Sequence, residues 1–506
     1  MMRRLPTISR AVLLGMGLTQ LLATGHVYLS NRNLHESLVL IAQAGYLPLP
    51  NEYIMGTLLD MGPAFLGGLF FTLTVGAGLS ILAGTLGWAW TCMLKKNRGA
   101  MFLLATLWIS LVVLLNITGF SAVVTSYFLL VPALVFLMTS RWTRSFRSGH
   151  SGQTWLNRMA PVLAIILLTL VWASLADRLL FMNIRDYLLL SNPVGTAVDR
   201  FYYRYTLYPA QAFKPLDQKT LKTCLLDGVE DENRKKRIIT ALEAYDYLPV
   251  SRPDPVDVKL VAKNSELAVT DGQRTVVETT VADFLSDPQR PLHRFSAAVD
   301  TYGPFRRATF LCLLVGFPVL LYILVFALSH WAISYLVAAP ERWNLYAAVT
   351  CLVIGLGLLA AVHTGRLEPV SLAELPTALE SNSWRQRTEG LRLIVQKRLE
   401  IGHYPAYKQG LTSPHVPERY WLTKAIGLSR DPDTCPDLLT LLEDPHPNVV
   451  SMAFQALGHR GDSRWIPEIL RRIKTSRHWY NQWYAYRALK SLGWRQHRAT
   501  SPTPTP

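Results

Sequence analysis

The sequence predicts a mainly α-helical chain: a polytopic α-helical membrane protein with a small α+β extramembrane domain and a C-terminal α-solenoid. Three observations carry this prediction. Half of the 506 residues are hydrophobic and only 17% are charged, whereas soluble proteins average about 25% charged residues. Residues 63–94 and 99–140 contain no Asp, Glu, Lys or Arg, and the segment beyond residue 420 repeats itself. We therefore expect neither a disordered nor a purely soluble chain.

Seven apolar runs are long enough to cross a bilayer, because a hydrocarbon core of about 30 Å needs about 20 helical residues. The first run follows a basic start but lacks the small-residue cleavage site of a signal peptide, which favours an uncleaved span. Residues 99–140 are too long for one helix, and Asn116–Ser121 divides them into a pair. The expected spans are 11–30, 65–94, the two halves of 99–140, 159–176, 308–339 and 345–363.

The basic residues between these runs predict the orientation of the first five spans. With the N-terminus in the cytoplasm, ten of the eleven Lys and Arg residues before Asp177 lie in cytoplasmic segments, and only Arg32 lies outside. This is the bias of the positive-inside rule. Residues 177–307 are then non-cytoplasmic, which in a bacterium means periplasmic. We expect an integral protein of the bacterial inner (cytoplasmic) membrane.

The side on which the C-terminal part lies depends on the number of spans. Seven spans put it on the non-cytoplasmic side, together with residues 177–307. Arg306 and Arg307 conflict with this topology, because it leaves both basic residues on the outer side. In the alternative, residues 308–339 form two short passes hinged near Pro318, and the C-terminus then lies in the cytoplasm. Because long translocated domains largely escape the charge rule, we favour the seven-span parity.

Residues 177–307 are predicted to form a small α+β domain. Helices are expected at about Asp217–Leu226 and Glu232–Tyr245. Strands are expected at Val256–Ala262 and over Glu266–Val281, the latter folded back on itself at an Asp-Gly pair that favours a tight hairpin. About 130 residues suffice to bury a core of their own.

The C-terminal segment contains an internal repeat of 31 residues. Each unit is predicted to be a helix closed by Gly, followed by a second helix started by Asp and Pro. A single helix pair cannot cover its apolar face, so neighbouring pairs stack into a solenoid. A third, looser copy ends at Gly493 after a four-residue insertion between residues 474 and 483. The matching positions are Gly427 and Gly458, Asp431 and Asp462, and Pro436 and Pro467.

The stretch Asp444–Asp462 resembles the HEAT-repeat family, in its short phycobilisome-lyase-like form, and the resemblance extends over residues 414–494. It implies a surface for protein interaction, but no lyase chemistry, since no bilin pocket is found. The Arg that the family places early in the first helix is Val450 here, whereas the preceding copy has Arg419 and the third has Ala485. The Arg–Asp ladder between repeats is therefore expected to be thinned.

These signals predict a division of the chain into six parts. The parts are a five-span region 1–176, a non-cytoplasmic α+β domain 177–307, two further spans 308–363, a linker and helical lead-in 364–413, HEAT-like repeats 414–494 and a disordered tail 495–506.

No catalytic, cofactor or metal site is predicted, and we expect no enzyme. The five cysteines include no CxxC pair, and no nucleotide, hydrolase or metalloprotease motif occurs. About half of the net charge of +16 lies before Asp177, mainly in short segments beside apolar runs, which is a topology signal, and most of the rest lies in residues 364–506. We therefore expect no binding of nucleic acid.

Two groups of side chains are candidates for contacts with partners. The first comprises basic and aromatic residues near the repeats that we expect to be exposed as a protein-interaction surface: Arg419, Arg460, Trp465 and Trp479. The second belongs to the aromatic stretch 201–208 and is expected at the membrane interface or against a ligand, although tyrosines also form ordinary cores: Arg200, Tyr203, Arg204 and Tyr205. In the second span, Gly76, Ser80 and Gly84 permit close helix packing, either internally or with a partner subunit.

The sequence favours a non-enzymatic membrane scaffold or assembly protein that binds protein partners through its repeats and its non-cytoplasmic domain. The alternative is a non-catalytic membrane subunit of a transporter or another multi-subunit membrane complex. An enzyme that acts on lipid at the aromatic stretch 201–208 is a third hypothesis. The expected partners are other proteins of a membrane complex and the lipid bilayer.

Overall fold

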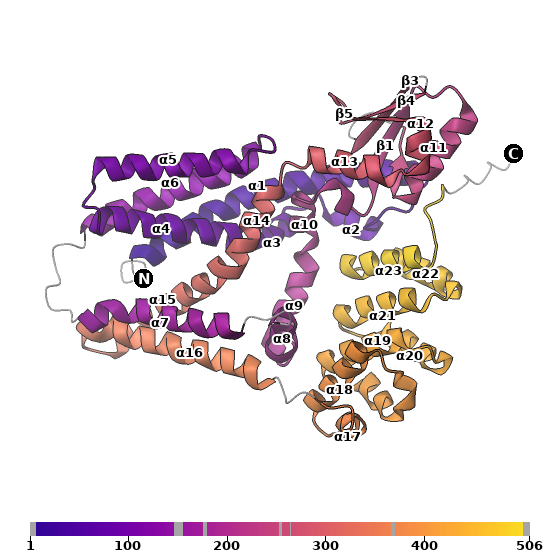
Figure 1. Ribbon diagram of the computed structural model, residues 1–506. Helices are drawn as coiled ribbons and strands as arrows, with labels where there is room; N and C mark the ends of the chain where they lie inside the picture. Colours follow the sequence, from indigo (N-terminus) through magenta and orange to yellow (C-terminus); the bar gives the residue numbers. More distant parts are fainter. Residues whose placement is uncertain are drawn as a thin grey trace. The chain divides into compact units, whose positions relative to one another are not determined.

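The computed structural model describes residues 7–145, 155–175, 180–251, 256–263, 265–365 and 370–498. The chain divides into two compact units, each of which collects three separate segments (Figure 1). The tail expected at 495–506 lies outside the described residues from 499 onwards, as does the expected boundary at 176/177. The first unit is Met1–Leu29, Met61–Arg178 and Asp300–His363, and the second unit is Ser30–Asp60, Leu179–Val299 and Thr364–Pro506.

The first unit is entirely helical in its described part. Six helical stretches of the described chain are long and apolar enough to cross a membrane, and α7 contains a shorter apolar stretch, Met159–Ser174. The helix from α14 to α15 continues through Pro318 without a break. The elements are α1 (Thr7–Gln43, shared with the second unit), α3 (Met61–Phe71), η2 (Thr72–Gly76), α4 (Ala77–Cys92), α5 (Arg98–Leu115), α6 (Ala122–Ser145), α7 (Trp155–Leu175), α14 (Gly303–Leu311), η5 (Cys312–Gly316), α15 (Phe317–Leu336), η6 (Pro340–Arg342) and α16 (Trp343–Gly365).

Small residues let the helices of the first unit approach α4 closely. Gly76, Ser80 and Gly84 are all buried. A Cβ added to Gly76 would lie 2.5 Å from Cγ2 of Thr19 on α1, and one added to Gly15 would collide with Ser80. Internal packing therefore accounts for this row of small residues.

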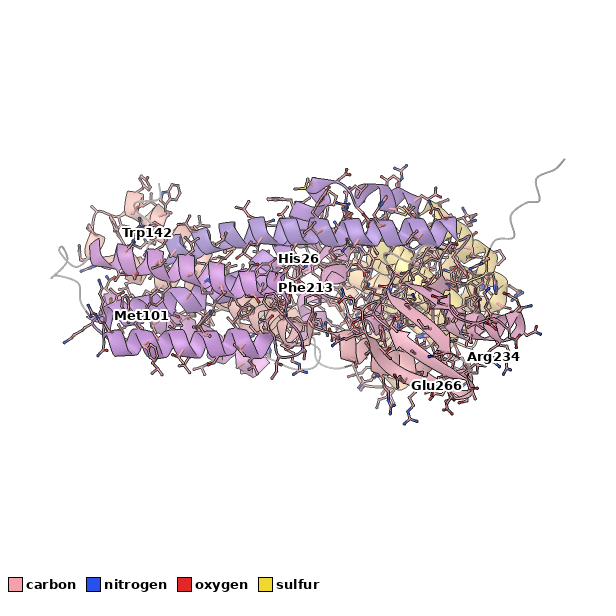
Figure 2. All side chains as sticks on the ribbon, turned by 90° about the horizontal axis from the view of Figure 1, so that it is seen from above. His26, Met101, Trp142, Phe213, Arg234 and Glu266 are labelled. Atoms are coloured by element: carbon pink, nitrogen blue, oxygen red, sulfur yellow. The ribbon has the colours of Figure 1, made fainter. Side chains whose placement is uncertain are left out.

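Contacts at the helix ends fix the relative direction of the helices in the first unit. The guanidinium of Arg10, early in α1, lies 5.0 Å from the ring centroid of Trp142, late in α6. Figure 2 labels Trp142. Between α5 and α6, the Thr118 hydroxyl donates to the carbonyl of Thr301, which precedes α14. The Leu345 amide at the start of α16 donates to the Asn157 side chain at the start of α7. These three pairs are those expected if consecutive long helices run in alternating directions.

The second unit contains a five-stranded sheet of order β2-β1-β3-β4-β5. β1 pairs in parallel with β2 and β3, whereas β4 pairs antiparallel with β3 and β5. Three helices bury their apolar sides against one face of this sheet. The elements are β1 (Lys222–Asp227), α11 (Glu232–Ala244), β2 (Tyr247–Pro249), β3 (Val258–Lys263), β4 (Glu266–Thr270), β5 (Thr275–Thr280), α12 (Val281–Ser286) and α13 (Gln289–Val299).

The sheet tests the expectations for residues 217–281. The helix expected from Glu232 is α11, and the hairpin expected from Glu266 is the β4–β5 pair; Figure 2 labels Arg234 and Glu266 in these elements. The helix expected at Asp217–Leu226 is wrong, because this stretch contains β1, preceded by one 3-10 turn. Cys224 is fully buried and pairs with neighbours on both sides, and such pairing outweighs local propensity.

The C-terminal helices stack as a solenoid. α18, α19, α21 and α23 are successive neighbours in one layer, and α20 and α22 lie beside them in a second. The elements are α17 (Leu375–Glu380), α18 (Trp384–Lys397), η7 (Ile401–His403), η8 (Pro405–Thr412), α19 (Val416–Leu428), η9 (Pro432–Thr434), α20 (Cys435–Leu441), α21 (Pro447–Arg460), η10 (Ser463–Trp465), α22 (Ile466–Thr475) and α23 (Trp479–Ser491).

The repeated glycines have a different role from the expected one. Gly427 and Gly458 lie inside α19 and α21 rather than in the turns that close them. A Cβ on Gly427 would lie 2.6 Å from Cβ of Ala456, and one on Gly458 would lie 2.9 Å from Cα of Ala488. The glycines therefore let successive repeats touch, and the left-handed residue that ends α21 is Gly461.

The solenoid shares its core with segments far away in the sequence. Ile41, Tyr46, Leu49, Leu190 and Leu248 belong to the same buried cluster as the solenoid helices. The solenoid is thus one part of a larger body and not an independent arm. The remaining elements of this unit are α2 (Glu52–Thr57), α8 (Leu180–Asn183), η3 (Ile184–Leu189), α9 (Pro193–Tyr205), α10 (Leu207–Ala212) and η4 (Leu216–Gln218).

Candidate binding groove

A short polar motif precedes each first helix of the solenoid. The backbone N–H of His415, His446 and His478, the residues that cap α19, α21 and α23, donates to the side chain two positions earlier. These acceptors are Ser413, Asp444 and Ser476, and they recur at intervals of 31 and 32 residues. The motif fixes the chain direction into each helix and places three histidines at equivalent points of successive repeats.

Arginines link consecutive repeats. Nε and Nη2 of Arg387 on α18 lie 2.6 and 2.9 Å from the two carboxylate oxygens of Glu418. Nε and Nη2 of Arg419 on α19 contact Asp444 in the same way, at 2.5 and 3.0 Å. Such two-pronged pairs are strong and directional. The ladder stops at Val450, in agreement with the thinning that the resemblance implies.

A residue from far upstream completes the last repeat. The side-chain amide of Asn51 donates to three backbone carbonyls at the end of α22, and its backbone N–H donates to Gln482 on α23. Gln482 occupies the position that Arg419 has two repeats earlier, since both stand four residues after the capping histidine. The assignment of Ala485 to this position is therefore wrong, because Gly493 matches Gly461 and not Gly458: both have a positive φ, and they are as far apart as His446 and His478.

Buried charges join η3 to the solenoid. The carboxylate of Asp186 is fully buried; it accepts the indole N–H of Trp421 at 2.8 Å and pairs with Arg185 at 2.7 Å. The Arg185 guanidinium also lies 3.9 Å from the ring centroid of Tyr420. The hydroxyl of the next residue, Tyr187, donates to the Glu389 carboxylate of α18. Removing one partner from such a buried set leaves an uncompensated charge.

The buried side of α9 contacts the caps of the solenoid. The Asn448 side chain donates to Asp199 at 3.0 Å, and Nε2 of His446 lies 3.6 Å from the same carboxylate. Burial raises the pKa of Asp199 to about 6, although Arg185 and the bond from Asn448 oppose this. Burial also lowers the pKa of His446 to about 3, and Arg200 and Arg419 add to this effect. His446 is therefore neutral at neutral pH.

A groove of about 860 Å³ lies between α9 and the loops that lead into α19 and α21. One wall is formed by residues 190–200, and the other by residues 411–419 and 440–446. Arg200 is exposed on the first wall, whereas Arg419 and Asp444 on the second wall are already paired with each other. Among the described residues, no group of three or more His, Cys, Asp or Glu side chains is placed to hold a metal ion.

The four candidate residues of the repeats are less exposed than expected. Arg419 is buried, so its expected exposure is wrong, and Arg460, Trp465 and Trp479 are half-buried. Arg460 donates to backbone carbonyls and to the Thr434 hydroxyl of the preceding repeat. Trp465 packs against the solenoid core. These side chains first of all hold the solenoid together, and their part in binding a partner remains a prediction.

The four candidates of the aromatic stretch differ in exposure. Arg200 and Arg204 are exposed, whereas Tyr203 and Tyr205 are half-buried. The Tyr203 carbonyl accepts the indole N–H of Trp479 at 3.1 Å. The structure therefore brings members of the two candidate groups together: Tyr203 meets Trp479, and Arg200 shares the groove with Arg419.

Sequence reasoning missed several residues that build this region. Asp186, Asp199 and Asn51 stand in segments without a recognisable motif, and only folding brings them to the solenoid. The histidine caps did leave a signal: Ser413-Pro-His415, Asp444-Pro-His446 and Ser476-Arg-His478 recur in the register of the repeat. Aligning the repeats from their helix starts, rather than from their glycines, would have revealed it.

Comparison with known proteins agrees with the architecture of the C-terminal part. No match to the chain was found among curated proteins or among solved structures. The sequence model of the HEAT-repeat family matches residues 404–498. This confirms the resemblance seen in the sequence and begins ten residues earlier than the expected start at 414. The C-terminal part of this chain is thus an array of HEAT repeats.

Proposed function

We propose that the protein is an integral membrane scaffold or assembly protein whose HEAT repeats bind a protein partner in the groove beside α9. One observation carries the proposal: the HEAT repeats share a core with residues 41–49 and 190, so the groove is held open by a rigid frame. HEAT repeats commonly present extended surfaces to other proteins. We propose a binding role and no catalysis.

The connectivity of the second unit supports a membrane topology with seven spans. Its three segments must leave the bilayer on one side, so an even number of crossings must separate them. Between Asp60 and Leu179 the chain has α3–α4, α5, α6 and α7, and between Val299 and Thr364 it has α14–α15 and α16. The first of these stretches has four crossings if the short helix α7 spans the bilayer. The second has two crossings if the helix through Pro318 passes only once. Both numbers are then even, as the condition requires. This favours parity over the two-pass alternative.

The charge bias then suggests which side the second unit occupies. Ten of eleven basic residues before Asp177 lie in segments on the opposite side, which is cytoplasmic by the positive-inside rule. The second unit would therefore lie in the periplasm of a bacterium, with the inner membrane as the site of insertion. The contacts of Arg10 with Trp142 and of Asn157 with Leu345 fall at the cytoplasmic end in this topology.

The groove is the part of the solenoid that we expect a partner to occupy. The layer of α18, α19 and α21 is already contacted by η3 and α9 of the same chain. The groove is uncovered, contains about 860 Å³ and is bordered by the exposed Arg200. An extended or helical peptide segment with an acidic side chain would fit this combination of shape and charge.

Site-specific photocrosslinking in native membranes tests the proposal. A photoreactive residue in place of Ala197, which is exposed on the groove wall, should give a crosslinked product of defined mass. The same residue in place of Arg234, on α11 of the sheet domain, is the control and should not give that product. A crosslink that is lost in the Arg200→Glu variant would support binding in the groove. Identical products from both positions, or none from Ala197, would contradict it.

Point variants are preferable to deletion of the repeats. Because residues 41–49 and 190 share the core of the solenoid, deletion would expose apolar surface and unfold the second unit.

The composition of the crosslinked product also separates the scaffold from the alternative, a subunit of a multi-subunit complex. A single partner in one-to-one ratio would favour the subunit, whereas several substoichiometric partners would favour the scaffold.

A further inference from the structure

The helix α9 has three distinct sides. On the buried side, Asp199 contacts Asn448 of the solenoid and Gly195 packs against Leu189 of η3, whereas Thr196, Ala197 and Arg200 line the groove. The remaining side is apolar and exposed to a degree that is unusual for such residues. It consists of Val194, Val198, Phe201 and Tyr202, whose exposed fractions are 75, 53, 40 and 50%.

The spacing of these four residues makes a continuous apolar stripe. Positions i, i+4, i+7 and i+8 fall on one face of an α-helix. The other two sides of α9 are occupied by the solenoid and by the groove, so internal packing does not explain the stripe. An exposed apolar stripe beside basic residues is typical of helices that lie in a membrane interface.

The C-terminal end of α9 is tethered close to a candidate span. The hydroxyls of Thr57 and Tyr208 lie 3.2 Å apart, and Tyr208 stands in α10, which follows α9 directly. The candidate span Met61–Cys92 begins four residues after Thr57. Four residues reach at most about 14 Å. If Met61 enters the bilayer, the end of α9 lies near the surface of that bilayer.

Basic and aromatic residues beside the stripe suit a lipid surface with anionic headgroups. Arg200 and Arg204 are exposed; Arg200 lines the groove, and Arg204 stands one turn later on the same side of α9. Arg204 also lies 5.7 Å from the ring centroid of Tyr205, whose own ring contacts Phe201. Arginine attracts anionic headgroups, and tyrosine prefers the membrane–water boundary.

We infer that α9 lies on the membrane surface, with Val194, Val198, Phe201 and Tyr202 inserted among anionic lipids and the groove facing water. This inference rests on the proposed insertion of the first unit into a bilayer. In this arrangement, α9 holds the groove at a fixed distance from the membrane surface. A partner that binds there would therefore itself be membrane-anchored or membrane-proximal.

Spin labels at neighbouring positions of α9 test the inference. The full-length chain, with the half-buried Cys92, Cys312 and Cys435 replaced by Ala, carries one label at Val198→Cys, Ala197→Cys or Leu107→Cys. Each variant is placed in nanodiscs of phosphatidylcholine and phosphatidylglycerol. Accessibility is measured to oxygen, which partitions into lipid, and to a nickel chelate, which stays in water. The thermal unfolding midpoint of each variant confirms that it is folded.

We expect the Val198 label to be accessible to oxygen and protected from nickel, and the adjacent Ala197 label to show the reverse. Leu107, 59% exposed on α5, reports on the insertion of the first unit. Lipid access at Leu107 together with water access at Val198 would overturn the inference and leave the proposed membrane insertion intact. Water access at both positions would overturn both. In nanodiscs of phosphatidylcholine alone, which lack anionic headgroups, we expect the Val198 label to be more accessible to nickel. Unchanged accessibility would contradict the proposed attraction of the arginines to anionic lipid.

Discussion

The indole N–H of Trp421 donates to the carboxylate of Asp186 across a separation of 235 residues in the sequence, at a distance of 2.8 Å. This bond joins a HEAT repeat to the π-helical turn η3, and the carboxylate is fully buried between Trp421 and Arg185. A buried carboxylate with these partners fixes one relative position of the two elements. The solenoid is therefore an integral part of the second unit.

Asp186→Ala is expected to destabilise the second unit by about 3–5 kcal/mol, because Arg185 would then be a buried charge without its counter-ion. Glu232→Ala is the matched control, since Glu232 forms an exposed pair with Lys235 on α11 and exposed pairs contribute little. Chemical denaturation followed by tryptophan fluorescence measures both. Equal stability of the two variants would show that the buried pair does not hold η3 to the solenoid.

Local patterns predicted the helices and the repeat, and long-range pairing decided the rest. The apolar run at 99–140 and its break at Asn116 correspond to α5 and α6, and the Asn116 side chain accepts the Ser121 N–H in the turn between them. β1 was not predicted, because its strand form depends on pairing with β2 and β3, in which Cys224 lies opposite Pro249 and Val258. Arg419 looked like an exposed charge because its partner, Asp444, stands one repeat later. No single-residue pattern could reveal that Asn51 would reach the last repeat.

Gly427→Ala is expected to destabilise the solenoid by about 1–3 kcal/mol, the usual effect of overfilling a close contact. A Cβ at this position would meet Cβ of Ala456 at 2.6 Å. Gly56→Ala on α2 is the control, because a Cβ there would meet nothing within 4 Å, and alanine favours helix. Thermal unfolding should show a lower midpoint for the first variant and an equal or higher one for the second. A tolerated Gly427→Ala would mean that α19 and α21 can move apart without loss.

Acid is expected to destabilise the second unit through its capping histidines. Burial lowers the pKa of His478 to about 4, so the unfolded chain binds this proton more readily. Stability is then fully present above about pH 6.5 and is lost as the pH falls toward 4. The pKa of Asp199, raised to about 6, acts in the opposite sense below about pH 6, and so over most of this range. His478→Asn, which keeps a favourable capping residue, should therefore reduce the loss of stability between pH 7 and pH 4.5.

The control for this pH dependence is His293→Asn, whose side chain is 67% exposed. It should leave the slope of stability against pH unchanged. If both variants retain the slope of the unaltered chain, the acid sensitivity has another source, and the buried caps do not contribute to it.

Asn51→Asp should be more damaging than Asn51→Ala, although aspartate has almost the same shape as asparagine. The side-chain amide of Asn51 donates to the carbonyls of Ile473, Lys474 and Ser476 at 2.9 to 3.0 Å. Alanine removes these bonds, each of which contributes about 1 kcal/mol net, whereas aspartate would place a negative charge against three carbonyl oxygens. Asn33→Asp, at an exposed position of α1, is the matched control for the added charge. The unfolding free energy should fall in the order unaltered chain, Asn51→Ala, Asn51→Asp; the reverse order of the two variants would mean that Asn51 acts by filling space and not by donating hydrogen bonds.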